Sequence, residues 1–330
     1  MSDVVLQNDV IENEPQQPKK KINWIEIGRA LRTQSGWIWL IPALILLGMF
    51  TIYPIFNTLF SAFRENFKAL SKTHDGFGFL NFKYVLEHDF FIRCLKNTFL
   101  FAIISVPVST ILALLLSVAL ASIKPLQRAY QSVFFLPYLT NSMSIGAVFK
   151  VMFDVIGTKR QLLNGLGSWG LINQLLGTEI IWTKAGAPIW AQMTVILLYE
   201  IWSGLPFKIL ILFGALQSVN KQYYDAAKVD GANKGRILWR ITVPLLSPQI
   251  AYLVITGIIG GFKSYSAIVG IYGEKMGVTT YSMGTIVGLV YQFIYDGETG
   301  YAAACSLILF AIIMVITVIN LFVSKKKVHY

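Results

Sequence analysis

Long apolar stretches alternate with shorter polar segments along this chain. A run of about 20 apolar residues is long enough to cross a bilayer core of roughly 30 Å. Six runs reach this length: Trp37–Phe60, Thr98–Ala121, Val133–Phe153, Ile189–Leu216, Pro248–Ile271 and Ala302–Val323. The pattern therefore predicts an all-α, polytopic membrane protein with six transmembrane helices.

A further apolar stretch, Met283–Phe293, is shorter and contains two glycines. We expect a re-entrant or surface helix there, and a seventh span is the alternative.

The spans divide the chain into four parts. Residues 1–36 form a polar tail with an interfacial helix, and residues 37–92 form the first span with its outer loop. Residues 93–323 form the main transmembrane domain, and residues 324–330 form a basic tail.

Composition and charge indicate a membrane protein and its orientation in the bilayer. Hydrophobic residues make up 55% of the chain and charged residues only 14%, against about 25% charged in soluble domains. With six spans and both termini on one side, that side carries 15 Lys/Arg and 7 Asp/Glu, and the other side 10 and 9. The positive-inside rule then makes the termini and the Asp225–Pro244 loop cytoplasmic. The net charge of +11 thus reflects membrane topology, and it does not indicate nucleic-acid binding.

The sequence carries no recognisable catalytic or cofactor site. The two cysteines and three histidines are too far apart to form a metal site or a disulfide framework. Gly165–Gly170 has the spacing of a dinucleotide fingerprint, but it lacks a preceding strand, and we interpret it as a turn. No GxxxxGK[ST] motif occurs. We therefore expect no enzyme activity, metal or cofactor in this chain, and any ATP with Mg²⁺ would be bound by another subunit.

Four charged residues fall within or at the ends of the spans: Lys150, Glu200, Lys208 and Lys263. A charge at the bilayer centre costs at least about 2.5–3.5 kcal/mol. We expect Lys150 and Lys208 to extend toward the headgroups. Glu200 precedes the segment Ile201–Pro206, whose Gly and Pro we expect to break the helix. Glu200 then lines a passage, or pairs with one of the lysines.

The segment Gly257–Gly261 contains a GxxxG pattern. Such glycines allow two helices to approach closely. The alternative is that the missing side chains leave room for a substrate, and from these residues alone packing is the favoured interpretation.

The cytoplasmic loop is more regular than a simple connection requires. If Lys221–Asp230 is a helix, then Tyr223, Ala226, Ala227 and Asp230 share one face. Gly231 permits the left-handed turn that ends a helix, and a second amphipathic helix is expected over Lys234–Thr242. Small residues flanked by Tyr and Asp predict a surface on which a partner docks.

At these residues the chain resembles the type I ABC importer permeases, whose EAA signature reads roughly EAAxxDGAxxxxxFxxIxLP. This chain has Asp225 for Glu, Leu238 for Phe and Val243 for Leu. The resemblance implies a coupling helix that sits in a cleft of a cytoplasmic ATPase. The implied coupling residues are Tyr224, Asp225, Ala226, Ala227, Asp230, Gly231 and Ala232.

Other segments resemble the carbohydrate-uptake subgroup, notably Asn81–Tyr84, Asn97-Thr98 and Leu136-Pro137. Gly273–Lys275 departs from the Gly-Gly-Pro that often follows the fifth span in this subgroup. The chain is similar to the larger membrane subunit of maltose-type importers. That similarity implies a substrate pathway formed by residues of the fourth and fifth spans: Glu200, Ser203, Gly204, Phe207, Gly257, Gly261 and Ser264.

The resemblance also implies partners. These are a second homologous permease, two ATPase subunits and an extracytoplasmic solute-binding protein, with a sugar or oligosaccharide as cargo. Two alternatives are an ABC permease for a non-sugar solute and a secondary transporter driven by an ion gradient. The second alternative requires coupling acids in the spans, and only Glu200 qualifies.

Overall fold

The computed structural model describes residues 40–123, 127–154, 169–184, 187–273 and 283–327. Its regular elements are helices, and strand pairing in these ranges is limited to two isolated bridges, Arg64 with Phe77 and Lys68 with Thr73. The chain divides into two compact units, residues 1–57 and residues 58–330. The predicted tail of residues 1–36, most of the Gly165–Gly170 turn, Glu274-Lys275 and the end of the basic tail lie outside the described residues.

Four helices in the described ranges are long and apolar enough to cross a membrane. The first, Leu40–Phe63, includes a π-helical turn, η1 (Gly48–Ile52), and then α2 (Tyr53–Phe63). The others are α4 (Phe91–Ser122), α9 (Ile189–Ser218) and α16 (Thr299–Lys327). Two bent helix pairs raise the number of candidate spans to as many as six. The chain is thus an α-helical protein of several spans.

The expected third span, Val133–Phe153, is not one straight helix. It is formed by α5 (Gln127–Leu139) and α6 (Ser142–Phe153), which meet at an angle of 97°. Asn141 causes the new start, because its backbone is extended and its Oδ1 accepts hydrogen bonds from the N–H groups of Met143 (2.9 Å) and Ser144 (3.3 Å). An N-cap of this kind begins a second helix in a new direction.

The expected fifth span, Pro248–Ile271, also ends early. Helix α13 (Ser247–Phe262) is followed by a break at Lys263–Tyr265 and by α14 (Ser266–Tyr272). The dihedrals of Tyr265 (φ −147°, ψ −61°) are not helical, so the chain turns there. Helix α14 then crosses α6 closely, since a Cβ on Gly146 would lie 2.9 Å from the Cα of Gly270.

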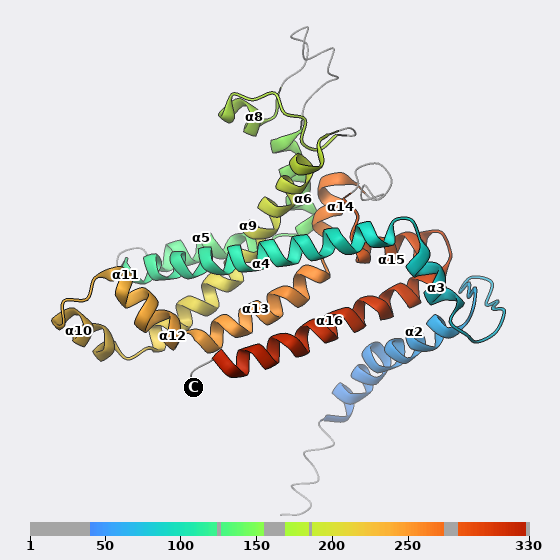
Figure 1. Ribbon diagram of the computed structural model, residues 1–330, viewed down its shortest axis with the longest axis horizontal. Coiled ribbons are helices and arrows are strands. Elements are labelled where there is room, and N and C mark those ends of the chain that lie inside the picture. The colour runs from blue at the N-terminus through green and yellow to red at the C-terminus, as the bar shows by residue number, and fades with distance from the viewer. Residues whose placement is uncertain (1–39, 124–126, 155–168, 185–186, 274–282, 328–330) are drawn as a thin grey trace, which may run out of the picture. The chain divides into compact units, whose positions relative to one another are not determined.

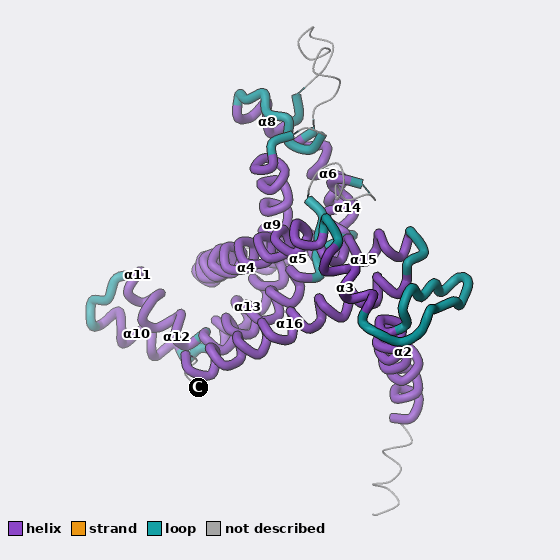
Figure 2. The backbone as a smooth tube through the Cα atoms, turned by 45° about the vertical axis from the view of Figure 1, so that its right-hand side comes forward, coloured by secondary structure: helices purple, strands orange, loops and turns teal. Residues whose placement is uncertain are grey.

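Within residues 58–330, α4 packs along α9 and α13, and α13 packs along α16 (Figures 1 and 2). The larger apolar core contains Phe101, Phe262 and Ile268, and a smaller one surrounds Leu212 and Leu253. Helix α15 (Ile286–Tyr295) packs on α16 and α4. It has only ten residues, too few to span a membrane, which agrees with a short helix over Met283–Phe293.

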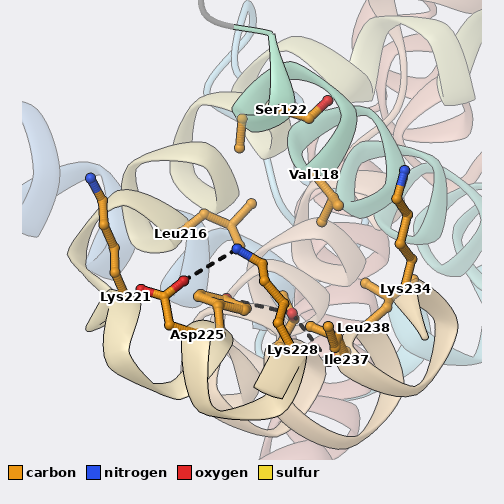
Figure 3. Close-up of a pocket in the computed structure, with 12 residues that line it drawn as sticks. Val118, Ser122, Leu216, Lys221, Asp225, Lys228, Lys234, Ile237 and Leu238 are labelled. Carbon is orange, nitrogen blue, oxygen red and sulfur yellow. Dashed lines mark hydrogen bonds and ion pairs between the residues drawn. The ribbon is translucent and has the colours of Figure 1, made fainter. Parts of the chain in front are cut away.

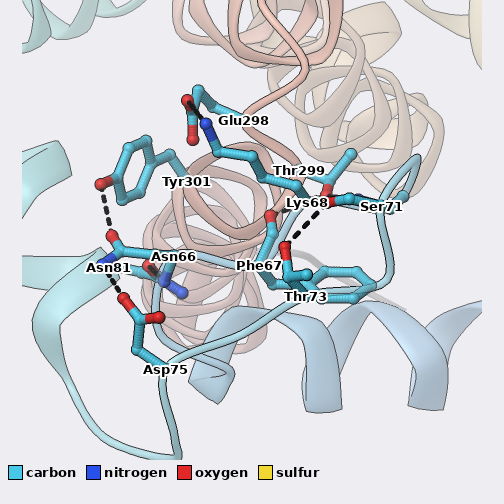
Figure 4. A network of polar contacts seen from close by, with 11 residues as sticks. Asn66, Phe67, Lys68, Ser71, Thr73, Asp75, Asn81, Glu298, Thr299 and Tyr301 are labelled. Atoms are coloured by element: carbon cyan, nitrogen blue, oxygen red, sulfur yellow. Dashed lines mark hydrogen bonds and ion pairs between the residues drawn. The ribbon is translucent and has the colours of Figure 1, made fainter.

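The segment between α2 and α3 (Leu80–Glu87) is held against the start of α16 by polar contacts (Figure 4). Asn81 is fully buried and donates hydrogen bonds to the carbonyls of Ala62 (2.9 Å) and Arg64 (2.7 Å). Its Oδ1 accepts from the N–H of Asn66 (3.1 Å), whose own Oδ1 accepts from the Tyr301 hydroxyl (2.7 Å). Asn81, in the segment that resembles the sugar subgroup, therefore connects this segment to α2 and, through Asn66, to α16.

Candidate functional site

The cytoplasmic loop of the sequence analysis folds as two short helices joined by a left-handed turn. The first, α10 (Lys221–Val229), is N-capped by Asn220. Asp230 is its C-cap rather than its last helical residue. Gly231 has φ +72°, and the N–H of Ala232 bonds to the carbonyl of Ala227 at 2.9 Å. The positive φ predicted for Gly231 is therefore present, in a hydrogen-bonded helix end.

The second helix is longer than expected. Its parts are α11 (Lys234–Ile237), a π-helical turn η2 (Leu238–Thr242) and α12 (Val243–Leu245). Together they run through Pro244 to Leu245 before the 70° bend into α13. Pro244 lies within this continuous run, directly after the π-helical turn.

The predicted docking residues of α10 differ in exposure. Tyr223 is 55% exposed, and Ala226 and Asp230 are also exposed. Ala227 is buried, at 8% exposure, so it packs inward and does not present its side chain to a partner. The solvent-facing surface of α10 is therefore formed around Tyr223, Ala226 and Val229, the last being 88% exposed.

A second candidate site is a polar cavity of about 200 Å³ at the start of α6, the middle of α9 and the break after α13. Three of the predicted pathway residues, Glu200, Ser203 and Ser264, line it together. The other lining residues are Ser142, Tyr199, Gly260, Lys263, Tyr265, Ser266 and Ala267. The sequence pattern does not identify these residues as part of a site. They reach the cavity only because the chain bends at Asn141 and breaks at Lys263–Tyr265.

Glu200 pairs with a hydroxyl rather than with a lysine. The Ser264 hydroxyl donates a hydrogen bond to its carboxylate. Among the described residues neither Lys208 nor Lys263 forms an ion pair with it. The expected helix break after Glu200 is absent, since α9 continues from Ile189 to Ser218 with Pro206 inside it. Packing against the neighbouring helices keeps a proline-containing helix continuous in this setting.

Lys208 does not extend to the headgroups as expected. Its side chain is buried between α9 and α4, where Nζ donates to the carbonyl of Val106 (3.1 Å) and to the hydroxyl of Ser109 (2.5 Å). The ammonium group is thus satisfied within the protein. Lys150, by contrast, is exposed on α6.

The remaining predicted pathway residues lie outside this cavity. A Cβ on Gly257 would lie 2.9 Å from a Val106 methyl group, and a Cβ on Gly261 would lie 3.0 Å from the Cβ of Ala102. Both glycines therefore let α13 approach α4. A Cβ on Gly204 would meet the Ser109 hydroxyl at 3.5 Å, and the Phe207 ring stacks on Tyr138 with centroids 5.8 Å apart.

Known proteins of similar sequence and structure are membrane transport components. Residues 37–329 match the family described as "binding-protein-dependent transport system inner membrane component". The chain is 30% identical over 280 residues to the probable ABC transporter permease protein MG188 of Mycoplasma genitalium, covering 82% of this chain and 80% of that one. It is 29% identical to the multiple sugar-binding transport system permease protein MsmF of Streptococcus mutans, with 91% and 98% covered.

A solved structure shares the fold. It is a bacterial alginate ABC transporter in complex with an alginate pentasaccharide-bound periplasmic protein. It superposes with a TM-score of 0.71 at 20% identity, with 92% of this chain and 97% of that chain covered. The family match extends over almost all of the described helices, from the first span to α16. The chain therefore belongs to the binding-protein-dependent transport system inner membrane components, and it is a permease subunit of an ABC importer rather than an enzyme.

Proposed function

We propose that this permease imports a sugar or oligosaccharide. Two observations support this cargo. The similar MsmF protein is named as a sugar permease, and the polar cavity offers the chemistry that a polyol needs. Four serine hydroxyls and the Glu200 carboxylate provide hydrogen-bonding groups, and two tyrosines provide ring surfaces. Glu200, Ser203 and Ser264 would bind cargo directly.

The other predicted pathway residues act through helix packing in this proposal. Gly257 and Gly261 hold α13 against α4, and Gly204 lies beside Ser109. Phe207 contacts Tyr138 in the bend-forming helix α5. A change at any of these positions would alter the relation between the helices that surround the cavity.

Transport is driven, in this proposal, by a partner on the cytoplasmic side. If the chain has six spans, the positive-inside rule predicts that both termini and the α10–α12 loop lie in the cytoplasm. Residues Tyr224–Ala232 then form the coupling element for an ATPase. ATP and Mg²⁺ are bound by two ATPase subunits and not by this chain. A second homologous permease completes the pathway, and an extracytoplasmic binding protein delivers the cargo; the alginate transporter was solved in complex with a periplasmic protein that holds an alginate pentasaccharide.

The observation that carries the coupling assignment is the left-handed Gly231 turn between α10 and α11. No side chain or backbone atom lies within 4 Å of a Cβ built there, so the site has space but the backbone favours glycine. A non-glycine residue at positive φ costs about 1–2 kcal/mol, which would distort the end of α10. Gly231→Arg should therefore reduce ATP-driven uptake in proteoliposomes at least tenfold while the complex still assembles.

Gly235→Arg is the matched control, because Gly235 lies in the same loop, is exposed and does not have a positive φ. It should leave uptake within about twofold of wild type. Normal uptake by Gly231→Arg would contradict the coupling role. Uptake that continues after ATP depletion but stops with an ionophore would instead indicate a secondary transporter.

A further inference from the structure

A pocket of about 450 Å³ lies behind α10, between this helix and the ends of two spans (Figure 3). Its walls come from the last turns of α4 and α9 and from the inward faces of α10, α11 and η2. The lining residues are Val118, Ala121, Ser122, Leu216, Lys221, Tyr224, Asp225, Lys228, Lys234, Ile237, Leu238 and Thr242. On α10 the lining positions are spaced i, i+3, i+4 and i+7, which is one helix face.

The pocket combines an apolar interior with a basic rim. Val118, Leu216 and Leu238 contribute aliphatic side chains. Three lysines lie around the opening, and one of them, Lys228, pairs with Asp225 at 3.2 Å. Lys221 and Lys234 lie on opposite sides of this pair in Figure 3 and form no ion pair among the described residues. The rim therefore carries an excess of positive charge.

The pocket lies at the ends of two helices that are candidate membrane spans. Helix α4 ends at Ser122 and α9 ends at Ser218, and both are membrane-spanning by length and composition. Val118, Ala121 and Ser122 of α4 and Leu216 of α9, near the ends of these helices, line the pocket. Basic residues near a membrane surface each contribute about 1 kcal/mol to binding anionic lipid.

These features select an anionic phospholipid over other occupants. A small soluble anion would pair with the lysines but would leave the aliphatic side chains unfilled. A neutral lipid would fill the apolar part but would not use the charge. The exposed side of α10, around Tyr223 and Val229, faces away from the pocket and remains available to a protein partner.

We propose that this pocket binds one anionic phospholipid, with its phosphate between Lys221 and Lys234 and its acyl chains against Val118, Leu216 and Leu238. The lipid fills the space between the spans and α10, the helix proposed above to couple to the ATPase. The assignment of the cytoplasmic leaflet rests on the orientation proposed above, whereas the binding itself does not depend on cargo or on the ATPase.

The test measures lipid binding to the full-length permease, purified in its assembled importer. Phosphatidylglycerol is titrated in detergent, and the bound lipid is counted by native mass spectrometry. The variant Lys221→Gln/Lys234→Gln should bind phosphatidylglycerol about 30-fold more weakly, as the loss of two basic contacts implies. The matched control, Arg236→Gln/Arg240→Gln, removes the same charge from exposed residues of the same loop that do not line the pocket. It should change the affinity by less than about threefold.

Further arms identify the ligand. Phosphatidylcholine should bind at least tenfold more weakly than phosphatidylglycerol. Glycerol 1-phosphate, which has no acyl chains, should not compete at millimolar concentration. The variant Lys221→Arg/Lys234→Arg should bind phosphatidylglycerol as the wild type does. This result would show that the weaker binding of the Gln variant is not caused by misfolding. Equal loss in the pocket and control variants, equal binding of the two lipids, or competition by glycerol 1-phosphate would each overturn the proposal.

Discussion

Gly260 and Gly261 are neighbours on α13 but have different surroundings. A Cβ on Gly261 would lie 3.0 Å from the Cβ and 3.1 Å from the Cα of Ala102 on α4. Ordinary carbon–carbon contacts are about 3.5–4.0 Å, so one of the two helices would have to move. A Cβ on Gly260 would have no atom within 4 Å. Replacing each glycine by alanine therefore isolates the effect of the helix contact.

Both substitutions gain the same helix propensity, about 0.8–1.0 kcal/mol, so this gain cancels when the two variants are compared. The remaining difference is the overpacking at Ala102, which costs about 1–3 kcal/mol. Gly261→Ala should therefore be less stable than Gly260→Ala by about that amount. At about 2–4 °C per kcal/mol for chains of 150–250 residues, and less for a longer chain, the melting temperatures should differ by a few degrees.

The assay is thermal unfolding of the full-length protein in one detergent, followed by tryptophan fluorescence. Ala102→Gly removes the methyl group that Gly261→Ala would meet but loses about 0.8–1.0 kcal/mol of helix propensity, so recovery is measured against Ala102→Gly alone: in that background Gly261→Ala should cause little further loss of stability. Equal melting temperatures for the two alanine variants, or no recovery in the double variant, would refute the packing interpretation. Reduced uptake by Gly261→Ala at unchanged melting temperature would support the substrate interpretation instead.

Three other predictions concern single side chains. Asn81→Ala removes three hydrogen bonds at a fully buried position and should destabilise the protein by about 2–4 kcal/mol in chemical denaturation; Ser71→Ala, at an exposed position, should not. Lys208→Leu should loosen the contact of α9 with α4 at a cost of about 1–3 kcal/mol, seen as faster proteolysis. Burial lowers the pKa of His88, whose Nδ1 accepts the N–H of Phe90. The neutral His88 side chain therefore contributes its full stabilisation above the ordinary pKa of about 6.5, and this contribution is lost as the pH falls through the lowered pKa. The melting temperature of the wild type should fall more between pH 7.5 and pH 5 than that of His88→Gln. Equal decreases in the two proteins would contradict this.

The approximate positions of the long apolar helices follow from the apolar pattern, because each span must be apolar over about 20 residues. The fold of the loop over residues 221–245 also depends on local chemistry. Gly231 has the positive φ that its sequence position predicted, and Asn220 and Asn233 cap the two helices. Such features depend on neighbouring residues in the chain and can be interpreted without the fold.

Other features depend on contacts between residues far apart in sequence. Hydropathy treated Val133–Phe153 and Pro248–Ile271 as single spans, although Asn141 and Tyr265 turn the chain within them. Pro206 was expected to end a helix, yet α9 continues through it. Lys208 was expected at the membrane surface, whereas acceptors on α4 bury it.

Apolar pattern and local motifs thus determined where the long apolar helices and the two-helix loop over residues 221–245 lie. Only the tertiary structure decided which polar groups meet. Glu200 and Ser264 are 64 residues apart and share a hydrogen bond, and Lys208 bonds to Ser109 from 99 residues away. The physical reason is that an apolar interior forces each buried polar group to find a partner, and which partner is in reach depends on how the helices bend and cross.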